Sequence, residues 1–353
     1  MNLRQQVGQL IIAGLGGSTL TALERAWWKL IQPGGVILFR RNIEQTSQTI
    51  ALLRETAELT QSPQLRCIDL EGGLVDRLRD LTAPMPSAAA VFATGKRTNY
   101  VKHGRLIGRE TRMLGFNTVF APVLDLALPA SASVMRTRVV SAKPNDVIAY
   151  ASGFLDGLVS EKISGCGKHF PGLGGGALDS HEVMPRIERS WDELWQQDIA
   201  VFRELISKLP MVMVSHAAYL VRDKKPASIS RFWITEVLKK RLGFRGLIVS
   251  DDMEMGGILT QTSMDEAAVL AIAAGTDVIE ICKDPALALR AYEALLRESE
   301  HSAAFRKRVN EAARRVASHK RKYLSANAFR VPSDRALTKL RSDITKFTQE
   351  VAA

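Results

Sequence analysis

Eight short apolar runs constrain the fold of this 353-residue chain more than any other feature. Each run is continuously hydrophobic rather than alternating, which is typical of strands buried on both faces of a parallel sheet. Most are followed by an amphipathic stretch, such as 99–114 or 190–207. Strand–helix alternation repeated eight times predicts an α/β fold, a (β/α)8 TIM-type barrel; a doubly wound open sheet is the alternative. The runs are Gln9–Leu15, Gly35–Phe39, Arg66–Leu70, Thr118–Leu126, Ile163–His169, Pro210–His216, Leu247–Asp251 and Thr276–Ile281.

The C-terminal region has a different charge balance from the rest of the chain. Residues 301–353 contain 13 Lys or Arg and 4 Asp or Glu, and so account for most of the net charge of +11. Their apolar residues recur at helical spacing, which predicts helices over 302–323 and 334–351 with a linker at 327–332. We therefore expect a barrel over 1–323 and a helical extension over 324–353. No motif typical of nucleic-acid binding is present, so we expect a solvated helix surface and no nucleic-acid partner.

Cysteine usage and hydropathy indicate the cellular setting. Cys67, Cys166 and Cys282 are widely spaced and each lies in an apolar run. An odd count without a CxxC pair argues against a disulfide framework and a zinc site. No segment has 18 uninterrupted apolar residues, and the short run at 10–15 is interpreted as a first strand rather than a signal peptide. We expect a cytoplasmic monomer without metal, cofactor or membrane partner.

Charged or imidazole-bearing residues stand where five consecutive predicted strands end. Any one of them could be a helix cap or part of a rim salt bridge. Five in succession are difficult to explain in that way, because the carboxyl ends of barrel strands meet at one mouth, where barrel enzymes place their chemistry. The residues are Asp69 and Glu71, Asp125, Lys168 and His169, His216, and Asp251 and Asp252.

One of these strand ends leads into an unusually rich segment. Residues 168–181 contain a lysine, two histidines, an aspartate and four glycines. The preceding run ends in Gly165-Cys166-Gly167, which predicts a buried strand that opens into a polar loop. Gly174–Gly176 lacks the Lys-Ser/Thr pair of a phosphate-binding loop, so no nucleotide site is expected.

These motifs, taken in order, resemble the bacterial exo-β-N-acetylglucosaminidases of glycoside hydrolase family 3, in their short single-barrel form. The resemblance covers about residues 5–320, and its specificity comes from the combination rather than from any one piece. The matching pieces are Gly34–Asn42, Asp69–Gly73, Phe120–Asp125, Lys168–Gly172, Asp179–His181, Leu242–Gly246, Ser250–Met253 and Ala274–Asp277.

The resemblance implies a retaining mechanism, in which a carboxylate forms a covalent glycosyl-enzyme that is then hydrolysed. Asp251 matches the family nucleophile, although the sequence alone does not choose between Asp251 and its neighbour Asp252. His181 matches the family's acid/base, and Asp179 is placed to orient its ring. An imidazole is suited to this task, because its ordinary pKa near 6.5 lets it give and take a proton near neutral pH.

The resemblance also assigns residues that bind the sugar. Arg136 competes with Arg138 for the family's arginine, because the usual glycine there is missing. His216 is equally well explained as a ligand or as a packed, satisfied histidine. The assigned sugar-binding residues are Asp69, Arg77, Arg138, Lys168 and His169.

Three positions depart from the family pattern. Leu173 stands where a second histidine is usual, Gly175-Gly176 where Asp-Thr is usual, and Leu74 where an arginine is common. The loop keeps its length to Asp179–His181, so the acid/base assignment holds. The departures concern the loop and the side of the pocket that faces the leaving group.

The resulting prediction is a retaining, exo-acting β-N-acetylhexosaminidase acting on GlcNAc-containing saccharides, with cell-wall-derived muropeptides as the substrate implied by the resemblance. A phosphorylase on the same scaffold is the close alternative. A broad β-glucosidase is a further one, although such relatives usually carry a second domain that supplies the acid/base. A non-catalytic carbohydrate-binding barrel belongs to a different class, and the presence of both Asp251 and His181 argues against it.

Overall fold

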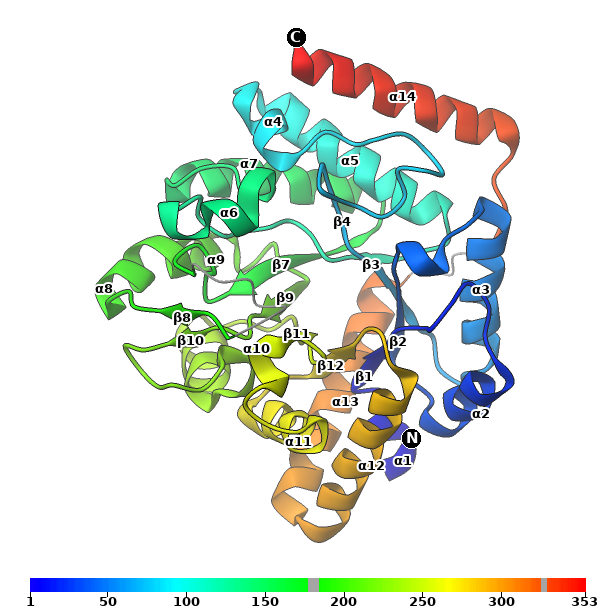
Figure 1. Ribbon diagram of the computed structural model, residues 1–353, viewed down its shortest axis with the longest axis vertical. Helices are drawn as coiled ribbons and strands as arrows, with labels where there is room; N and C mark the ends of the chain where they lie inside the picture. Colours follow the sequence, from blue (N-terminus) through cyan, green and yellow to red (C-terminus); the bar gives the residue numbers. More distant parts are fainter. Residues whose placement is uncertain (177–183, 325–328) are drawn as a thin grey trace.

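The computed structural model describes residues 1–176, 184–324 and 329–353. Eight parallel strands close into a barrel, which confirms the predicted fold (Figure 1). Each predicted run overlaps one of these strands. Around the barrel the order is β1 (Ile11–Ala13), β12 (Val278–Ile281), β11 (Leu247–Asp252), β9 (Met211–Val214), β7 (Ser164–Phe170), β6 (Thr118–Val119), β3 (Leu65–Ile68) and β2 (Gly35–Leu38).

Helices surround the barrel and connect its strands. The longer ones are α2 (Ala22–Ile31), α3 (Thr46–Glu58), α5 (Arg97–Met113), α7 (Pro144–Ser160), α9 (Ile199–Leu205), η6 (Phe232–Arg241), α11 (Met264–Ala274), α12 (Pro285–His301), α13 (Ala303–Tyr323) and α14 (Asp334–Ala352). Short helical segments are α1 (Leu3–Gly8), η1 (Arg40–Asn42), α4 (Ala88–Ala93), η2 (Pro129–Ser131), α6 (Ala132–Met135), η3 (Arg136–Arg138), α8 (Trp191–Glu193), η4 (Leu194–Asp198), η5 (Ala227–Ile229) and α10 (Gly256–Leu259). No described helix has the length and apolar character needed to cross a membrane.

Two small sheets lie outside the barrel ring. β4 (Leu70–Gly72) and β5 (Val75–Asp76) form an antiparallel hairpin directly after β3. β8 (Arg186–Ile187) pairs in parallel with β10 (Ala218–Tyr219). Both connect to the carboxyl ends of barrel strands, so they build up the rim at that end.

The fourth barrel strand is shorter than the predicted run 118–126. Regular pairing covers only Thr118 and Val119, and a single bridge joins Val123 to Lys168. Pro122 stands between them, and proline has no N–H to donate to the ladder. The chain nevertheless stays beside β7, because Cys166 and Lys168 donate backbone N–H groups to Ala121 and Pro122.

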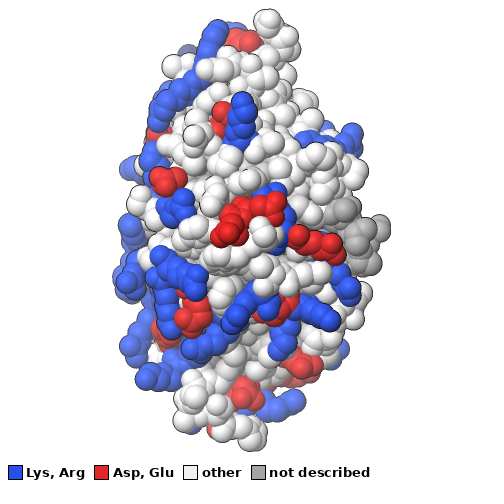
Figure 2. Space-filling view, turned by 90° about the vertical axis from the view of Figure 1, so that its left-hand side faces the viewer, with Lys and Arg blue, Asp and Glu red and all other residues white. Residues whose placement is uncertain are grey.

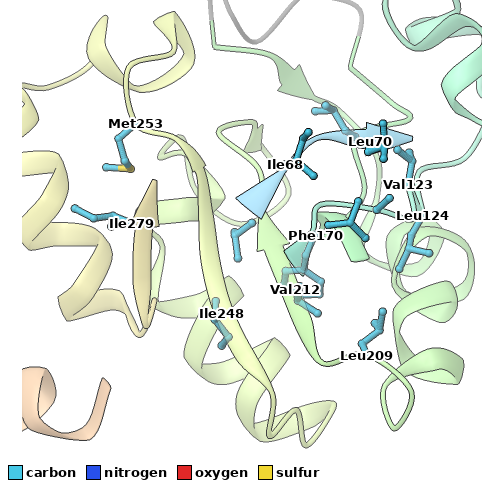
Figure 3. Packing of buried hydrophobic residues seen from close by; sticks show 14 of the residues in the cluster. Ile68, Leu70, Val123, Leu124, Phe170, Leu209, Val212, Ile248, Met253 and Ile279 are labelled. Atoms are coloured by element: carbon cyan, nitrogen blue, oxygen red, sulfur yellow. The ribbon is translucent and has the colours of Figure 1, made fainter. Parts of the chain in front are cut away.

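The hydrophobic core has two layers because successive strand residues point to opposite faces. Ile12, Ile37, Cys67, Met211 and Val249 belong to a cluster inside the barrel. Their neighbours in sequence pack outward against the helices, in a much larger cluster. Figure 3 shows part of it, with Ile68, Val212, Ile248 and Ile279 contributed by four different strands.

All three cysteines are free and buried in the interior cluster. Cys67 lies on β3, Cys166 on β7, and Cys282 directly follows β12. Burial raises the pKa of each thiol well above its usual value. They behave as small hydrophobic side chains, as their sequence context indicates.

The basic C-terminal helices are built into the fold. Val309, Ala312, Ala313 and Val316 form the buried face of α13. Arg308 and Arg315 hold the buried carboxylate of Asp277 at 2.7 and 2.8 Å. On the face shown in Figure 2, lysine and arginine side chains are interspersed with carboxylates. The division at residue 323 stays a prediction.

Candidate active site

A pocket opens at the carboxyl ends of the barrel strands, where the sequence predicted the site. Seven of its lining residues come from the predicted strand ends, from the β4–β5 hairpin region and from η3. These are Asp69, Glu71, Arg77, Arg138, Lys168, His169 and Asp251, and the apolar lining consists of Val75, Val134, Met135, Leu173 and Met255.

Two cations and two carboxylates form the floor of the pocket. Lys168 Nζ lies 2.7 Å from Asp69 Oδ1 and 2.7 Å from Glu71 Oε1. Arg138 donates from Nε and Nη2 to the two oxygens of Glu71, at 2.8 and 2.9 Å. Each charge in the floor therefore has an opposite partner within hydrogen-bonding distance.

The pKa values of these groups follow from the pairing. Burial acts to raise the pKa of Glu71, but Arg138 and Lys168 lower it well below its usual value. The pKa of Lys168 is raised, because Asp69 and Glu71 outweigh the opposing effect of burial. Glu71 therefore stays an anion and Lys168 a cation across the neutral pH range.

His169 is oriented by a buried carboxylate. Its Nδ1 lies 2.6 Å from Asp125 Oδ2. The Asp125 carboxylate also accepts the backbone N–H of His169 at 3.2 Å and that of Leu173 at 2.6 Å. This arrangement leaves the Nε2 edge of the ring for the pocket, and it fixes the start of the loop that follows β7.

Asp251 and Asp252 occupy different environments, although they are adjacent on β11. Asp251 lines the pocket, whereas Asp252 does not. Asp252 Oδ1 instead accepts backbone N–H groups of Glu254 and Cys282 at 3.0 and 3.2 Å. Of the two carboxylates, Asp251 is the one placed to meet a ligand.

The two carboxylates also differ in protonation. Burial acts to raise the pKa of Asp251, but His169, His216 and Lys168 lower it below its usual value. Burial raises the pKa of Asp252 to about 7, with the negative charges of Glu254 and Asp251 adding to the effect. Asp251 is therefore an anion at neutral pH, which a nucleophile requires.

Arg138 and Arg136, the two candidates for the family's arginine, occupy different positions relative to the pocket. Arg138 lines the pocket and contacts Glu71, whereas Arg136 is exposed. Arg136 has a φ of +46°, a region that favours glycine, so it occupies the position where a glycine would be unstrained. Arg77 also lines the pocket, and its guanidinium lies 5.7 Å from the ring centre of Phe39.

His216 is a packed histidine with both ring nitrogens hydrogen-bonded. Nδ1 lies 2.7 Å from Ser228 Oγ, and Nε2 lies 2.9 Å from the carbonyl oxygen of Asp252. Burial lowers its pKa. It supports the end of β11 rather than facing the pocket, which agrees with the second of the two interpretations that the sequence left open.

The predicted acid/base pair, Asp179 and His181, lies outside the described residues. All three departures from the family pattern lie in described residues. Gly175-Gly176 follow Leu173 in the loop after β7, and the N–H of Gly176 donates to the carbonyl oxygen of Leu173 at 3.0 Å. Leu173 lines the pocket where a second histidine is usual. Leu74 is 48% exposed and is not among the residues that line the pocket.

A larger cleft of about 570 Å³ lies at the opposite end of the barrel, beside the last turns of α13. Arg245, Arg315, His319 and Lys322 are among its lining residues, and none of the described residues that line it is a carboxylate. The described lining of this cleft therefore contains no carboxylate comparable to Asp251.

Residues 2–319 match the family model of the glycosyl hydrolase family 3 N-terminal domain. The chain belongs to glycoside hydrolase family 3. Among similar family members, a β-hexosaminidase of Tolumonas auensis is 38% identical over 283 residues, which cover 79% of this chain and 84% of the relative. A β-hexosaminidase of Idiomarina loihiensis is 33% identical, covering 86% of this chain and 92% of the relative.

Solved family 3 structures share the fold. A β-N-acetylglucosaminidase from Paenibacillus superposes with a TM-score of 0.89 at 29% identity, covering 99% of this chain and 69% of that chain. NagZ from Neisseria gonorrhoeae gives a TM-score of 0.79 at 28% identity, covering 96% of this chain and 97% of that chain. The same enzyme has been solved with N-trifluoroacetyl-D-glucosamine.

Two members of this family 3 site received no role from the sequence. Glu71 and Asp125 were noted only as strand-end acids, but one joins Lys168 to Arg138 and the other orients His169. The signal was present, since both follow apolar runs that end at the barrel mouth. The apolar wall from Val134 and Met135 gave no such signal, because hydrophobic residues near a helix are ordinary.

Proposed function

We propose that this family 3 enzyme is a retaining, exo-acting β-N-acetylglucosaminidase with Asp251 as its nucleophile. The observation that carries the proposal is the placement of Asp251, an ionised carboxylate facing a pocket whose floor is made of paired cations and carboxylates. The β-hexosaminidase relatives support the choice of sugar.

In the first step, an Asp251 Oδ atom attacks C1 of the sugar as the bond from C1 to the aglycone oxygen breaks. The leaving oxygen takes a proton from the imidazolium of His181. Positive charge develops on the sugar ring in the transition state, and a carboxylate at the reacting carbon stabilises it. The product of this step is a glycosyl ester of Asp251.

In the second step, water attacks C1 and gives one proton to the now neutral His181 imidazole. The bond between C1 and Asp251 breaks, and the carboxylate and the imidazolium are both regenerated. Two inversions at C1 give net retention. Asp179 would hold the ring in the orientation that both proton transfers need.

The proposed sugar-binding roles follow from the hydrogen-bonding groups of the polar residues that line the pocket. Asp69 would accept from sugar hydroxyls, while Arg77, Lys168, His169 and Arg138 would donate. Terminal GlcNAc of cell-wall-derived muropeptides is the proposed substrate, and the cytoplasm the proposed compartment. An amino-sugar ligand is supported by the GlcNAc analogue bound to NagZ of Neisseria gonorrhoeae.

The 2-acetamido group should dominate specificity. The aryl β-GlcNAc glycoside is expected to exceed the matching glucoside by at least about a hundredfold in kcat/KM, because a site built to bond a substrate group is left with unpaired polar atoms by an analogue that lacks it. Steady-state kinetics with the glucoside and xyloside as controls measure this ratio. Comparable turnover of GlcNAc and glucose substrates would instead favour the glucosidase assignment.

Hydrolysis is separated from phosphorolysis by the same assay. Turnover of the aryl GlcNAc glycoside should be independent of added phosphate, and the product should be free GlcNAc. A rate that requires phosphate, with a sugar phosphate as product, would assign the phosphorylase activity.

A further inference from the structure

One wall of the pocket is a segment that turns back on itself. Residues 70–85 start at β4, pass through β5 and end at Met85. Glu71, Val75 and Arg77 line the pocket, and Leu81–Pro84 lie farther along the same segment. The segment therefore has an inner part that meets the ligand and an outer part that faces the surrounding helices.

The two parts are linked by hydrogen bonds within the segment. The buried carboxylate of Asp76 accepts backbone N–H groups from Met85 at 3.0 Å and from Leu78 at 3.3 Å. The N–H of Gly73 donates to the carbonyl oxygen of Met85 at 2.9 Å. Arg77 follows Asp76 directly in the sequence, so these hydrogen bonds tie the backbone beside Arg77 to the outer part.

Helix α14 holds the outer part. Arg341 donates from Nε and Nη2 to the carbonyl oxygen of Leu81, at 3.1 and 2.8 Å. Thr348 Oγ1 lies 3.0 Å from the carbonyl oxygen of Pro84. Both contacts are made to backbone atoms, so they fix the path of the chain rather than one side chain.

The same helix is fastened to the barrel. Leu337, Leu340, Ile344 and Phe347 form its buried face, and the Phe347 ring lies 6.1 Å from that of His103 on α5. Arg109 on α5 pairs with Asp343 at 3.3 Å. Figure 1 shows α14 beside α4 and α5, at the edge of the molecule. It thus connects a barrel helix to the pocket wall.

We propose that α14 is a brace for the segment 70–85, and that Arg341 is a positioning residue for sugar binding. The proposal rests on the proposed function, in which Arg77 and its neighbours bind the sugar. It gives the C-terminal helix a role in substrate affinity, although the helix contributes no described residue to the pocket. Loss of the brace should weaken binding of the sugar more than it slows the chemical step, because Asp251 is on the other side of the pocket, on β11.

The test compares Arg341→Ala, Arg341→Lys and the matched control Lys339→Ala. Lys339 is on the same helix, is exposed, and pairs with Asp343, but it makes no contact with the segment 70–85 among the described residues. Three quantities are measured on the full-length chain: KM and kcat for the aryl GlcNAc glycoside, the thermal midpoint, and hydrogen–deuterium exchange of peptides covering 73–85.

Arg341→Ala should raise KM roughly fivefold to tenfold, with kcat changed less than about twofold, because binding lost equally from the ground state and the transition state raises KM and leaves kcat unchanged. Peptides over 73–85 should exchange faster, Arg341→Lys should recover part of both effects, and Lys339→Ala should match the wild type. Should Arg341→Ala not fold, Thr348→Val removes the Pro84 contact and carries the same comparison.

Unchanged exchange over 73–85 in a folded variant would overturn the brace, as would equal changes in Lys339→Ala. If the wild-type protein hydrolyses no GlcNAc glycoside, the proposed function fails, but the exchange measurement still decides whether α14 holds the wall. The two failures are therefore distinguishable.

Discussion

Asp251→Asn is expected to lower kcat for aryl GlcNAc hydrolysis by on the order of 10³-fold or more, with the fold intact. An amide of the same shape keeps the contacts of the side chain but cannot form the glycosyl ester, so the two-step route is lost. Steady-state kinetics and the thermal midpoint of the purified variant measure the two effects separately.

Asp252→Asn is the matched control. The carboxylate of Asp252 accepts two backbone N–H groups outside the pocket, and an asparagine oxygen can still accept them. We expect a much smaller loss of kcat in this variant. A 2-fluoro GlcNAc-type inactivator should label Asp251, detected by peptide mass spectrometry; a label on Asp252 or Glu71 would refute the assignment.

His181→Ala should slow substrates with poor leaving groups far more than activated aryl glycosides in the first step. A good leaving group departs without protonation, so it depends less on the acid, and loss of a general acid or base costs roughly 10²- to 10⁴-fold where protonation is needed. Hydrolysis of the glycosyl-enzyme should slow for all substrates alike, because water still needs a base. Comparing an alkyl with a nitrophenyl GlcNAc glycoside, under steady-state and pre-steady-state conditions, separates the steps.

His301→Ala provides the histidine control. His301 is exposed at the end of α12, where its ring bonds the carbonyl oxygen of Arg297. It should retain wild-type rates with both substrates. If His181→Ala affects good and poor leaving groups equally, the histidine acts on something other than the leaving group.

The barrel was predictable from sequence because its strands are buried on both faces and so have continuous hydrophobicity. The same pattern misjudged the length of β6, because Pro122 is apolar but has no N–H to donate to the strand ladder. The β4–β5 hairpin was not predicted. Its two strands, Leu70–Gly72 and Val75–Asp76, are too short for an alternating pattern of apolar and polar residues to be recognised. The helix at 334–351 was expected, but the spacing of its apolar residues does not reveal that it packs against α5.

Most residues of the candidate site were predictable from the sequence, whereas the ion pairs and hydrogen bonds that join them were not. Asp69, Lys168, His169 and Asp251 were found because they terminate apolar runs that must meet at one mouth. The pairing of Lys168 with Glu71 joins residues 97 positions apart, which spacing cannot reveal. The choice of Asp251 over Asp252 likewise depends on which backbone N–H groups lie within reach of each carboxylate.

The reactivity of the three buried thiols can be used to measure local unfolding of the barrel. Cys67, Cys166 and Cys282 belong to β3, to β7 and to the end of β12, which are separated by two or three steps around the ring. A cysteine thiolate attacks a disulfide reagent only where the reagent can reach it, so none of the three should react until its part of the barrel unfolds. Equal labelling rates would mean that the ring opens as one unit, whereas unequal rates would rank its sides by kinetic stability.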